Sequence, residues 1–270
     1  INLADPRIGS KIIYKTDDFF ADANRILNVS SPVFKDGLFD KHGKWMDGWE
    51  TRRRRSKGFD YLILKLGKPG KIFDVDIDTT HFNGNQPTHA SIEGKSVFNY
   101  IRLNIFPDGG VARLRLYGKI EMEKNFSSSK NFNLTSVLNG ASIVGCNNEH
   151  FGRAENIIAP GKGKNMGDGW ETRRSRGKNF DWLIIKFGKP GLIKKLEIDT
   201  HHFKGNYPDT CSIQTAHITK DVSNISIVNN SKKWKFILDK SKLSAHKKHI
   251  FKKFLIKRTK ENYLRINIYP

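Results

Sequence analysis

The sequence predicts an all-β chain made of two copies of a jelly-roll β-sandwich. One observation is an internal repeat, because Asp47-Gly48-Trp49-Glu50-Thr51-Arg52-Arg53 recurs almost unchanged as Asp168-Gly169-Trp170-Glu171-Thr172-Arg173-Arg174. A second is the succession of short apolar or alternating runs, with turn signals about every eight to twelve residues. This pattern favours an antiparallel sandwich or jelly roll over alternating helices and strands.

The repeat extends well beyond that motif. A shift of 121 positions, with no gap, also carries residues 78–85 onto residues 199–206. Agreement at charged, aromatic and glycine positions together indicates an internal duplication. We therefore expect one domain over residues 1–125 and a second over residues 126–270, with Ser127-Ser128-Ser129 in the polar linker.

Composition supports two domains with cores of their own. Of the 270 residues, 37% are hydrophobic and 11% aromatic, which is enough for a packed core in each copy. No apolar run approaches the ~18 residues that a membrane-spanning helix needs, so we expect no membrane anchor. The first residues also lack the apolar stretch of a signal peptide.

Cysteine usage bears on the compartment. Cys146 and Cys211 both lie in the second copy, so a disulfide is not part of the repeated design. We expect two free thiols, a reducing compartment and a cytoplasmic location.

The net charge of +21 has two explanations. Attraction to nucleic acid or another polyanion is one. A genome rich in A and T is the other, because Lys, Asn and Ile are all abundant. The lysines form no single block, and no RNA-binding pattern of spaced aromatic residues accompanies them. We therefore do not expect nucleic acid as a partner.

The early elements recur in order in the two copies. After a loop over residues 1–9, Ile12-Ile13-Tyr14 predicts a strand. Residues 61–66 predict a buried strand, and Gly67-Lys68-Pro69-Gly70 predicts a turn after it. Residues 74–78 alternate strictly, so their apolar members should face the core.

The later elements differ between the copies. In the first copy, residues 100–105 and 112–117 flank Pro107-Asp108-Gly109-Gly110 and predict a hairpin. The second copy has an insertion after Gln214, in which Ser226-Ile227-Val228 and residues 234–238 are strand-like. A helix is predicted near residues 243–254.

The second copy stops at Pro270 without the closing strand of the first. A sandwich cannot lose a strand without exposing an edge and part of its core. We therefore hypothesise that the sequence omits residues between Ser96 and Val97, and also beyond Pro270.

The repeated Trp-Glu-Thr-Arg-Arg motif has two interpretations. Arginine binds a carboxylate through two parallel hydrogen bonds, so Arg52 and Arg173 could hold an anion. Alternatively, an arginine paired with an acidic residue fixes the loop. We expect Trp49 and Trp170 to be core anchors in both cases.

The cluster at residues 78–85, repeated at 199–206, follows the end of a strand, where loops often place functional groups. Its Asp, His and Asn side chains could act as acid and base or hold a metal. Alternatively, Asp and Asn cap a turn while His packs on Phe. A tight metal site would need further His or Cys ligands at fixed spacing, and none appear.

An arginine and an asparagine also lie two positions apart on one strand of each copy, as Arg102 with Asn104 and Arg265 with Asn267. Such a pair would suit a carboxylate and an amide. The alternative is a solvated sheet face.

Taken together, these motifs resemble the allantoicase family. The resemblance rests on residues 166–174, 181–185, 199–208, 102–110 and 138–141, and covers nearly the whole chain outside about residues 220–260. It implies two tandem jelly-roll domains similar to galactose-binding modules. It also implies a homo-oligomeric enzyme that hydrolyses allantoate to ureidoglycolate and urea in purine breakdown. The second copy keeps the pattern more fully, since Gln86 of the first stands where the second has Tyr207.

The resemblance gives the candidate residues roles around a substrate with one carboxylate and two urea-like arms. The acid–base candidates are Glu171, Asp199 and His202, with Glu50 and His81 in the first copy. The substrate-binding candidates are Arg173, Arg174, Asn206, Arg265 and Asn267, with Arg52, Arg102 and Asn104 in the first copy. Whether a divalent metal takes part is left open. The rival hypothesis is a noncatalytic β-sandwich that binds sugars or polyanions.

Overall fold

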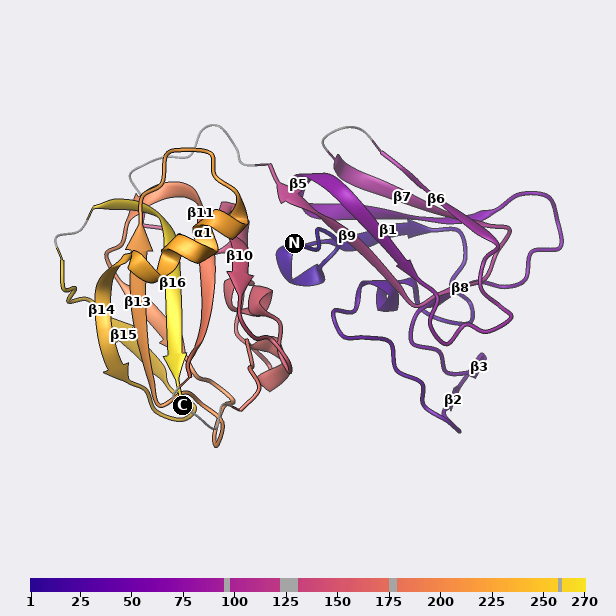
Figure 1. The fold of residues 1–270 in the computed structure, drawn as a ribbon. Helices are drawn as coiled ribbons and strands as arrows, with labels where there is room; N and C mark the ends of the chain where they lie inside the picture. The colour runs from indigo at the N-terminus through magenta and orange to yellow at the C-terminus, as the bar shows by residue number, and fades with distance from the viewer. Residues whose placement is uncertain (95–97, 122–130, 175–178, 257–258) are drawn as a thin grey trace. The chain divides into compact units, whose positions relative to one another are not determined.

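The computed structural model describes residues 1–270 except 95–97, 122–130, 175–178 and 257–258, and forms two compact units (Figure 1). The first unit is Ile1–Glu123 and the second is Lys124–Pro270. Apart from short helical turns, the described residues are almost entirely β-strand, as predicted.

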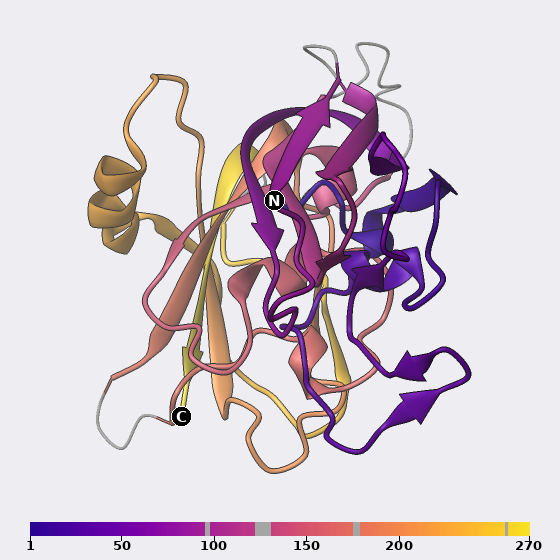
Figure 2. The ribbon, with the colours of Figure 1, turned by 90° about the vertical axis from the view of Figure 1, so that its right-hand side faces the viewer.

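The main sheet of the first unit has the order β1-β5-β7-β6, and β9 pairs with the far half of β5. These strands are β1 (Lys11–Lys15), β5 (Asp60–Asp78), β6 (His89–Glu93), β7 (Phe98–Phe106) and β9 (Arg113–Ile120). The shorter elements are η1 (Pro6–Ile8), η2 (Ala23–Leu27), β2 (Phe39–Asp40), β3 (Gly43–Lys44), β4 (Trp49–Glu50) and β8 (Gly110–Val111). The hairpin β2–β3 projects from the body of the unit (Figures 1 and 2).

The main sheet of the second unit has the order β10-β11-β16-β13-β14. Its strands are β10 (Ser142–Cys146), β11 (Asp181–Leu192), β13 (Thr210–Ala216), β14 (Lys235–Lys242) and β16 (Lys260–Tyr269), while β12 (Leu196–Asp199) and β15 (Lys248–Phe251) form a separate pair. The helical elements are η3 (Val137–Asn139), η4 (Ala154–Ile158), η5 (Met166–Asp168), α1 (Asn224–Asn230) and η6 (Ser231–Lys233).

The two units share one design. The order β1-β5-β7-β6 matches β10-β11-β16-β13, and each first strand has a register irregularity at the same place, between Ile12 and Tyr14 and between Ile143 and Gly145. The prediction of two tandem jelly-roll domains is therefore confirmed.

Alternating apolar residues build the core of the first unit. On β5, Leu62 and Leu64 are fully buried, and Ile101 and Leu103 of β7 are buried opposite them. Burial of each such side chain stabilises the fold by about 1.5–3 kcal/mol. Val75 keeps 37% of its surface exposed because the far half of β5 pairs with β9 on one side only, so its predicted place in the core was wrong.

Two turn predictions were wrong. The run Gly67-Lys68-Pro69-Gly70 stays extended within β5, where a side chain on Gly67 would collide with the backbone of Ile8. The predicted hairpin around residues 107–110 does not form, because β7 and β9 both pair with β5 and not with each other. In its place, β8 pairs with β4 and so holds the Trp49–Glu50 segment.

The insertion in the second unit also differs from its prediction. Ser226-Ile227-Val228 lies in α1, not in a strand, because the Ser223 side chain caps the helix and Ile227 is buried. The helix predicted near residues 243–254 is absent, since residues 248–251 form β15 against β12. Residues 234–238 were correctly predicted to be strand-like and largely form β14.

The hypothesis of missing residues between Ser96 and Val97 falls on positions outside the described residues. Among the helices of the described part of the chain, none is long and apolar enough to cross a membrane.

Candidate functional site

In each unit a glutamate and an asparagine from different segments form a hydrogen bond. Asn85 Nδ2 donates to Glu50 Oε1 over 2.6 Å, and Asn206 Nδ2 donates to Glu171 Oε1 over 2.6 Å. In the first unit, the backbone oxygen of Asn85 also accepts from Gly110 N at 2.8 Å, next to the β4–β8 pair. The fold thus brings together two predicted site residues, Glu171 and Asn206, that are far apart in the sequence.

The preceding tryptophan anchors the same segment in both units. Trp49 and Trp170 are buried, and their Nε1 atoms donate to the backbone oxygens of Asp17 and Asn148 at 2.7 and 2.8 Å. Both were correctly predicted as anchors. The tryptophan bond fixes the main chain next to the glutamate, and the glutamate side chain hydrogen-bonds to the asparagine.

Burial raises the pKa of Glu50, and the hydrogen bond from Asn85 opposes the rise. Because the pKa of Glu50 is raised in the folded state, its protonated form stabilises the fold at pH values below the ordinary pKa of 4.5. This contribution is lost as the pH rises through the folded-state pKa. We therefore expect E50Q to raise Tm at pH 7 by about 1–3 °C and to flatten the pH dependence of Tm above that value.

Thermal unfolding of wild type, E50Q and the exposed-site control D36N between pH 4 and 8 checks this expectation. The amide oxygen of a glutamine at this position can still accept the hydrogen bond from Asn85, so the local structure should be retained. If E50Q keeps the wild-type pH profile, Glu50 does not titrate with a raised pKa.

The arginines of the repeated motif have different neighbours. Arg52 Nη2 lies 2.8 Å from Asp17 Oδ1, and its Nε donates to the same oxygen over 3.0 Å. Arg173 Nη2 instead lies 3.3 Å from His150 Nδ1. Arg174 is exposed beside it. An exposed guanidinium of this kind can bind a carboxylate.

The chain was compared with known proteins. The family model described as "Allantoicase repeat" matches residues 1–98, 93–121 and 132–270. The probable allantoicase 1 of Burkholderia mallei is 43% identical over 306 aligned residues, which cover 100% of this chain and 90% of the relative. The chain belongs to the allantoicase family.

Further allantoicases are similar along the whole chain. The probable allantoicase of Acinetobacter baylyi is 42% identical, over 100% of this chain and 90% of that protein. A solved allantoicase from Saccharomyces cerevisiae is 28% identical with a TM-score of 0.81, and covers 100% of this chain and 89% of that one. Another solved allantoicase has a TM-score of 0.83 at 27% identity, with the same coverage.

In this allantoicase-family chain, the predicted histidines contact residues from other segments of their own unit. His202 Nε2 lies 2.9 Å from Gly163 O, and its backbone N–H donates to His246 Nδ1 over 2.9 Å. Asp199 Oδ1 accepts from the backbone of His201 at 2.9 Å. His81 packs near Phe34 with ring centroids 5.8 Å apart. The bond to Asp199 and the packing of His81 resemble the turn-capping alternative, whereas His202 contacts Gly163 and His246 from other segments and not a phenylalanine.

Asn104 and Asn267 are both buried, and only the arginines of the two strand pairs differ in exposure, because the Arg102 side chain is 34% exposed. Arg265 and Asn267 are 1% and 2% exposed, and Arg265 donates to Asn267 Oδ1 over 2.8 Å and to Ser231 Oγ over 2.5 Å. No surface is left on them for a substrate, so we do not include them in the proposed site.

In the first unit, Arg102 lies over the ring of Tyr61 at 4.0 Å and 3.8 Å from Glu93. Asn104 Nδ2 donates to Glu93 Oε1 over 2.7 Å. These contacts place Arg102 and Asn104 on the main sheet, whereas Glu50 belongs to the separate β4–β8 pair and Asn85 lies in a turn.

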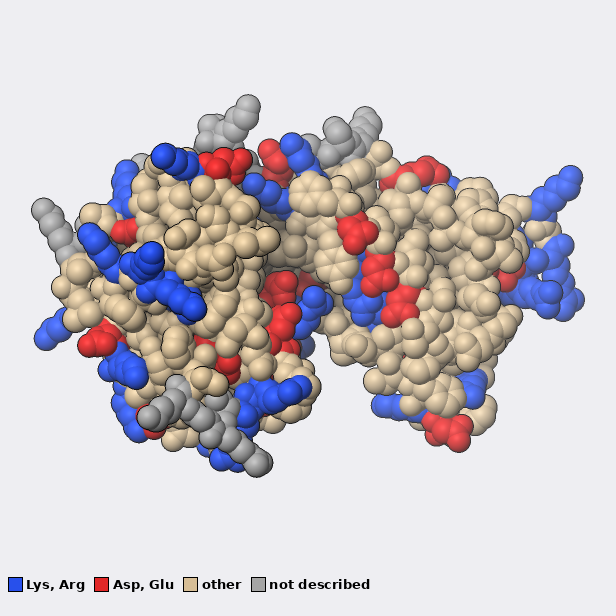
Figure 3. All heavy atoms as spheres, in the orientation of Figure 1, with Lys and Arg blue, Asp and Glu red and all other residues tan. Residues whose placement is uncertain are grey.

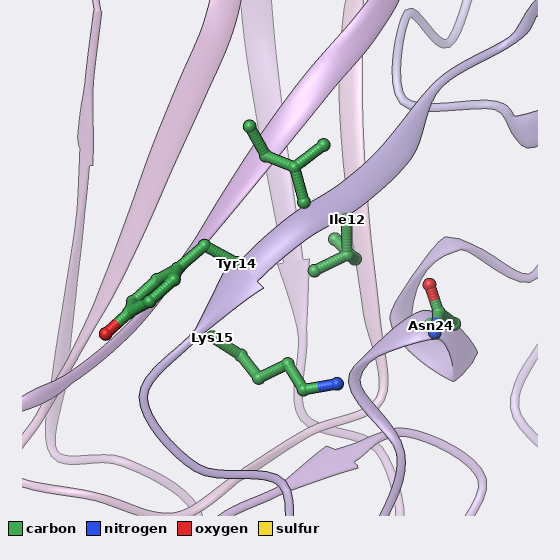
Figure 4. A pocket seen from close by; sticks show the side chains of 5 residues that line it. Ile12, Tyr14, Lys15 and Asn24 are labelled. Atoms are coloured by element: carbon green, nitrogen blue, oxygen red, sulfur yellow. The ribbon is translucent and has the colours of Figure 1, made fainter.

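A pocket of about 240 Å³ lies beside β1 and η2 in the first unit and is lined by Ile12, Ile13, Tyr14, Lys15 and Asn24. Figure 4 shows Lys15 directed toward Asn24 and Tyr14 directed away from it. The lining includes no carboxylate or imidazole for proton transfer, and no predicted site residue, so we do not assign the reaction to it.

Cys146 and Cys211 are both free, as predicted. Burial raises the pKa of Cys146 to about 11 and that of Cys211 to about 12, so neither is an activated thiolate. In the described residues, no group of three or more His, Cys, Asp or Glu side chains is arranged to hold a metal ion.

Sequence analysis did not select three residues that contact the motif arginines, namely Asp17, Asn148 and His150. The signal for them was present, because the 131-position shift that aligns the first strands also aligns Asp17 with Asn148. The composition of that loop alone gave no reason to select it.

Proposed function

We propose that this chain hydrolyses allantoate to ureidoglycolate and urea, and that the reaction takes place at Glu171, Asn206 and Arg173 in the second unit. The observation that carries the proposal is the 2.6 Å contact between Glu171 and Asn206, two positions from an exposed arginine, in a chain of the allantoicase family.

The side chains suit the chemistry of this substrate. Allantoate has a carboxylate and two ureido groups on one carbon. Arg173 offers a planar fork of donors for the carboxylate. The side-chain oxygen of Asn206 can accept from a ureido arm, while its Nδ2 donates to Glu171 and to Met166 Sδ. Glu171 supplies the acid–base group, because a carboxyl group within hydrogen-bond reach can transfer a proton during the reaction.

The proposed reaction balances with water as the only co-substrate. Glu171, as carboxylate, takes a proton from water, whose oxygen bonds to the central carbon. The bond from that carbon to one ureido nitrogen breaks, and Glu171 returns the proton to this nitrogen. Urea leaves, and the new hydroxyl group remains on ureidoglycolate. Asp199 and His202 are not needed in this scheme, since Asp199 accepts a backbone bond within its turn and the ring of His202 contacts Gly163 O.

The direct test is urea release from allantoate by the purified chain, followed colorimetrically. Steady release that is proportional to enzyme concentration supports the proposal. A protein that is folded by circular dichroism yet releases no urea refutes it.

The rival function is noncatalytic binding of a sugar or polyanion, for which the observation is the net charge of +21. On the face seen in Figure 3, however, basic side chains are dispersed in several groups with acidic ones between them. Salt-sensitive retention on heparin in the absence of urea release would favour this rival.

Two further predictions accompany the proposal. Homo-oligomer formation is tested by light scattering on the purified chain, where a monomer mass would contradict it. A cytoplasmic location, inferred from the two free cysteines, is tested by cell fractionation.

A further inference from the structure

Asp17 and Asn148 occupy equivalent places in the two units. Each accepts the Nε1 hydrogen bond of the buried tryptophan at its backbone oxygen. Each also accepts the backbone N–H of the motif arginine at its side chain, over 2.6 Å for Arg52 and 3.0 Å for Arg173. Position 17 and its twin therefore fix where the arginine backbone lies in both units.

The two side chains differ in what they do to the guanidinium. Asp17 is only 14% exposed and receives both Nε and Nη2 of Arg52 on Oδ1, at 3.0 and 2.8 Å. The Arg52 side chain is 65% exposed, but two of its nitrogens are already paired with a carboxylate. A substrate carboxylate would have to compete with Asp17, which is held permanently within reach.

Asn148 carries no charge, and among the described residues its Oδ1 accepts only the backbone N–H groups of Arg173 and His150. Within the described residues, no carboxylate lies within ion-pair distance of Arg173. Its guanidinium instead contacts the ring of His150, with Nη2 and Nδ1 3.3 Å apart. Arg173 therefore keeps donors available for an incoming anion.

We infer that the residue at this position selects which repeat accepts the anionic substrate: Asn148 leaves Arg173 available in the second unit, and Asp17 occupies Arg52 in the first. The inference rests on the proposed function for the identity of the substrate. Asn148 is a positioning residue, because it acts through Arg173.

The first test is N148D, which adds a charge at almost constant shape. One oxygen of the introduced carboxylate can keep the backbone hydrogen bonds of Arg173 and His150, while the other competes for the guanidinium. We expect KM for allantoate to rise about tenfold or more with kcat within about threefold, because binding and not proton transfer is weakened. A KM within about twofold of wild type overturns the inference.

The second test is the reverse change, D17N, read by calorimetry with N-carbamoylglycine, an inert molecule with one carboxylate and one ureido arm. Wild type should bind one molecule per chain, and D17N should bind two. A stoichiometry of one in D17N overturns the inference, even if N148D does not fold. The double variant D17N/N148D should bind one molecule, now in the first unit.

The kinetic and binding experiments can fail independently, so they distinguish the role of Asn148 from the proposed reaction. If wild type releases no urea but N148D weakens N-carbamoylglycine binding about tenfold, anion selection stands and the proposed reaction fails. If urea is released but N148D changes neither KM nor binding, the reaction stands and the selection by Asn148 fails.

Discussion

Replacing Glu171 with glutamine is expected to lower kcat for urea release by about 10²–10⁴-fold, the usual contribution of a positioned acid–base group. The amide oxygen of the glutamine can still accept the hydrogen bond that Asn206 gives to Glu171 at 2.6 Å, so the loops should stay in place. The substitution removes only the ability to take and return a proton. KM should therefore remain within about threefold of wild type.

Steady-state kinetics with colorimetric urea detection measures this effect, and circular dichroism confirms the fold. The matched comparison is E50Q, the same change in the equivalent pair of the first unit. A loss confined to E171Q places the reaction in the second unit. If E171Q retains at least a third of wild-type kcat, Glu171 is not the acid–base residue.

Replacing Arg113 with methionine is expected to destabilise the first unit by about 3–5 kcal/mol, the usual effect of leaving a buried charge without its partner. Arg113 is fully buried, and its Nη2 lies 2.6 Å from Asp47 Oδ2. It also donates to the backbone oxygens of Asp47 and Ser30. Although burial alone would raise the pKa of Asp47, the bond from Arg113 helps to hold it below its ordinary value.

The consequence reaches the candidate site because Asp47 lies two residues before Trp49 and three before Glu50. Methionine fills much of the space of arginine, so the main loss is of charge and hydrogen bonds. In the double variant D47N/R113M the stranded charge is gone, and part of the lost stability should return.

Denaturant unfolding followed by tryptophan fluorescence measures both effects. R115M is the control on the same strand, because Arg115 pairs with the more exposed Asp76 at 2.9 Å. Arg115 is only 15% exposed and also lies 3.7 Å from Asp78, but its partners are less buried than Asp47, so R115M should destabilise the unit less than R113M. An R113M variant no less stable than R115M would show that the buried pair does not hold the first unit together.

The sequence was a good guide wherever a feature depended on neighbouring residues or on comparison of the two copies. The apolar run over residues 61–66 predicted a buried strand, and its Leu62 and Leu64 are buried. The Trp-Glu-Thr-Arg-Arg repeat placed a buried tryptophan and an adjacent glutamate in both units. The sequence was a poor guide where the conformation of a segment depends on residues far away in the chain. Gly67-Lys68-Pro69-Gly70 has turn chemistry, but close packing against Ile8 keeps it extended.

The same limit applies to the candidate residues. Arg102 and Arg265 are equivalent in sequence, but η6 of the second unit supplies Ser231 and buries only Arg265. His202 has the residue type of a catalytic base, but its ring contacts the backbone of Gly163. No local pattern shows which acceptor a side chain will reach, because that acceptor comes from a separate segment of the chain.

By itself, the sequence determined the duplication, the β-class of each half, the family resemblance and the identity of Glu171 and Asn206 as candidates. Only the tertiary structure decided that these two touch, that β7 and β9 both join β5, and that Asp17 occupies Arg52 while Asn148 leaves Arg173 available. The physical reason is that strand periodicity and turn chemistry act over a few residues. Hydrogen-bond and ion-pair partners are instead set when folding brings together loops that are 35 positions apart in the chain.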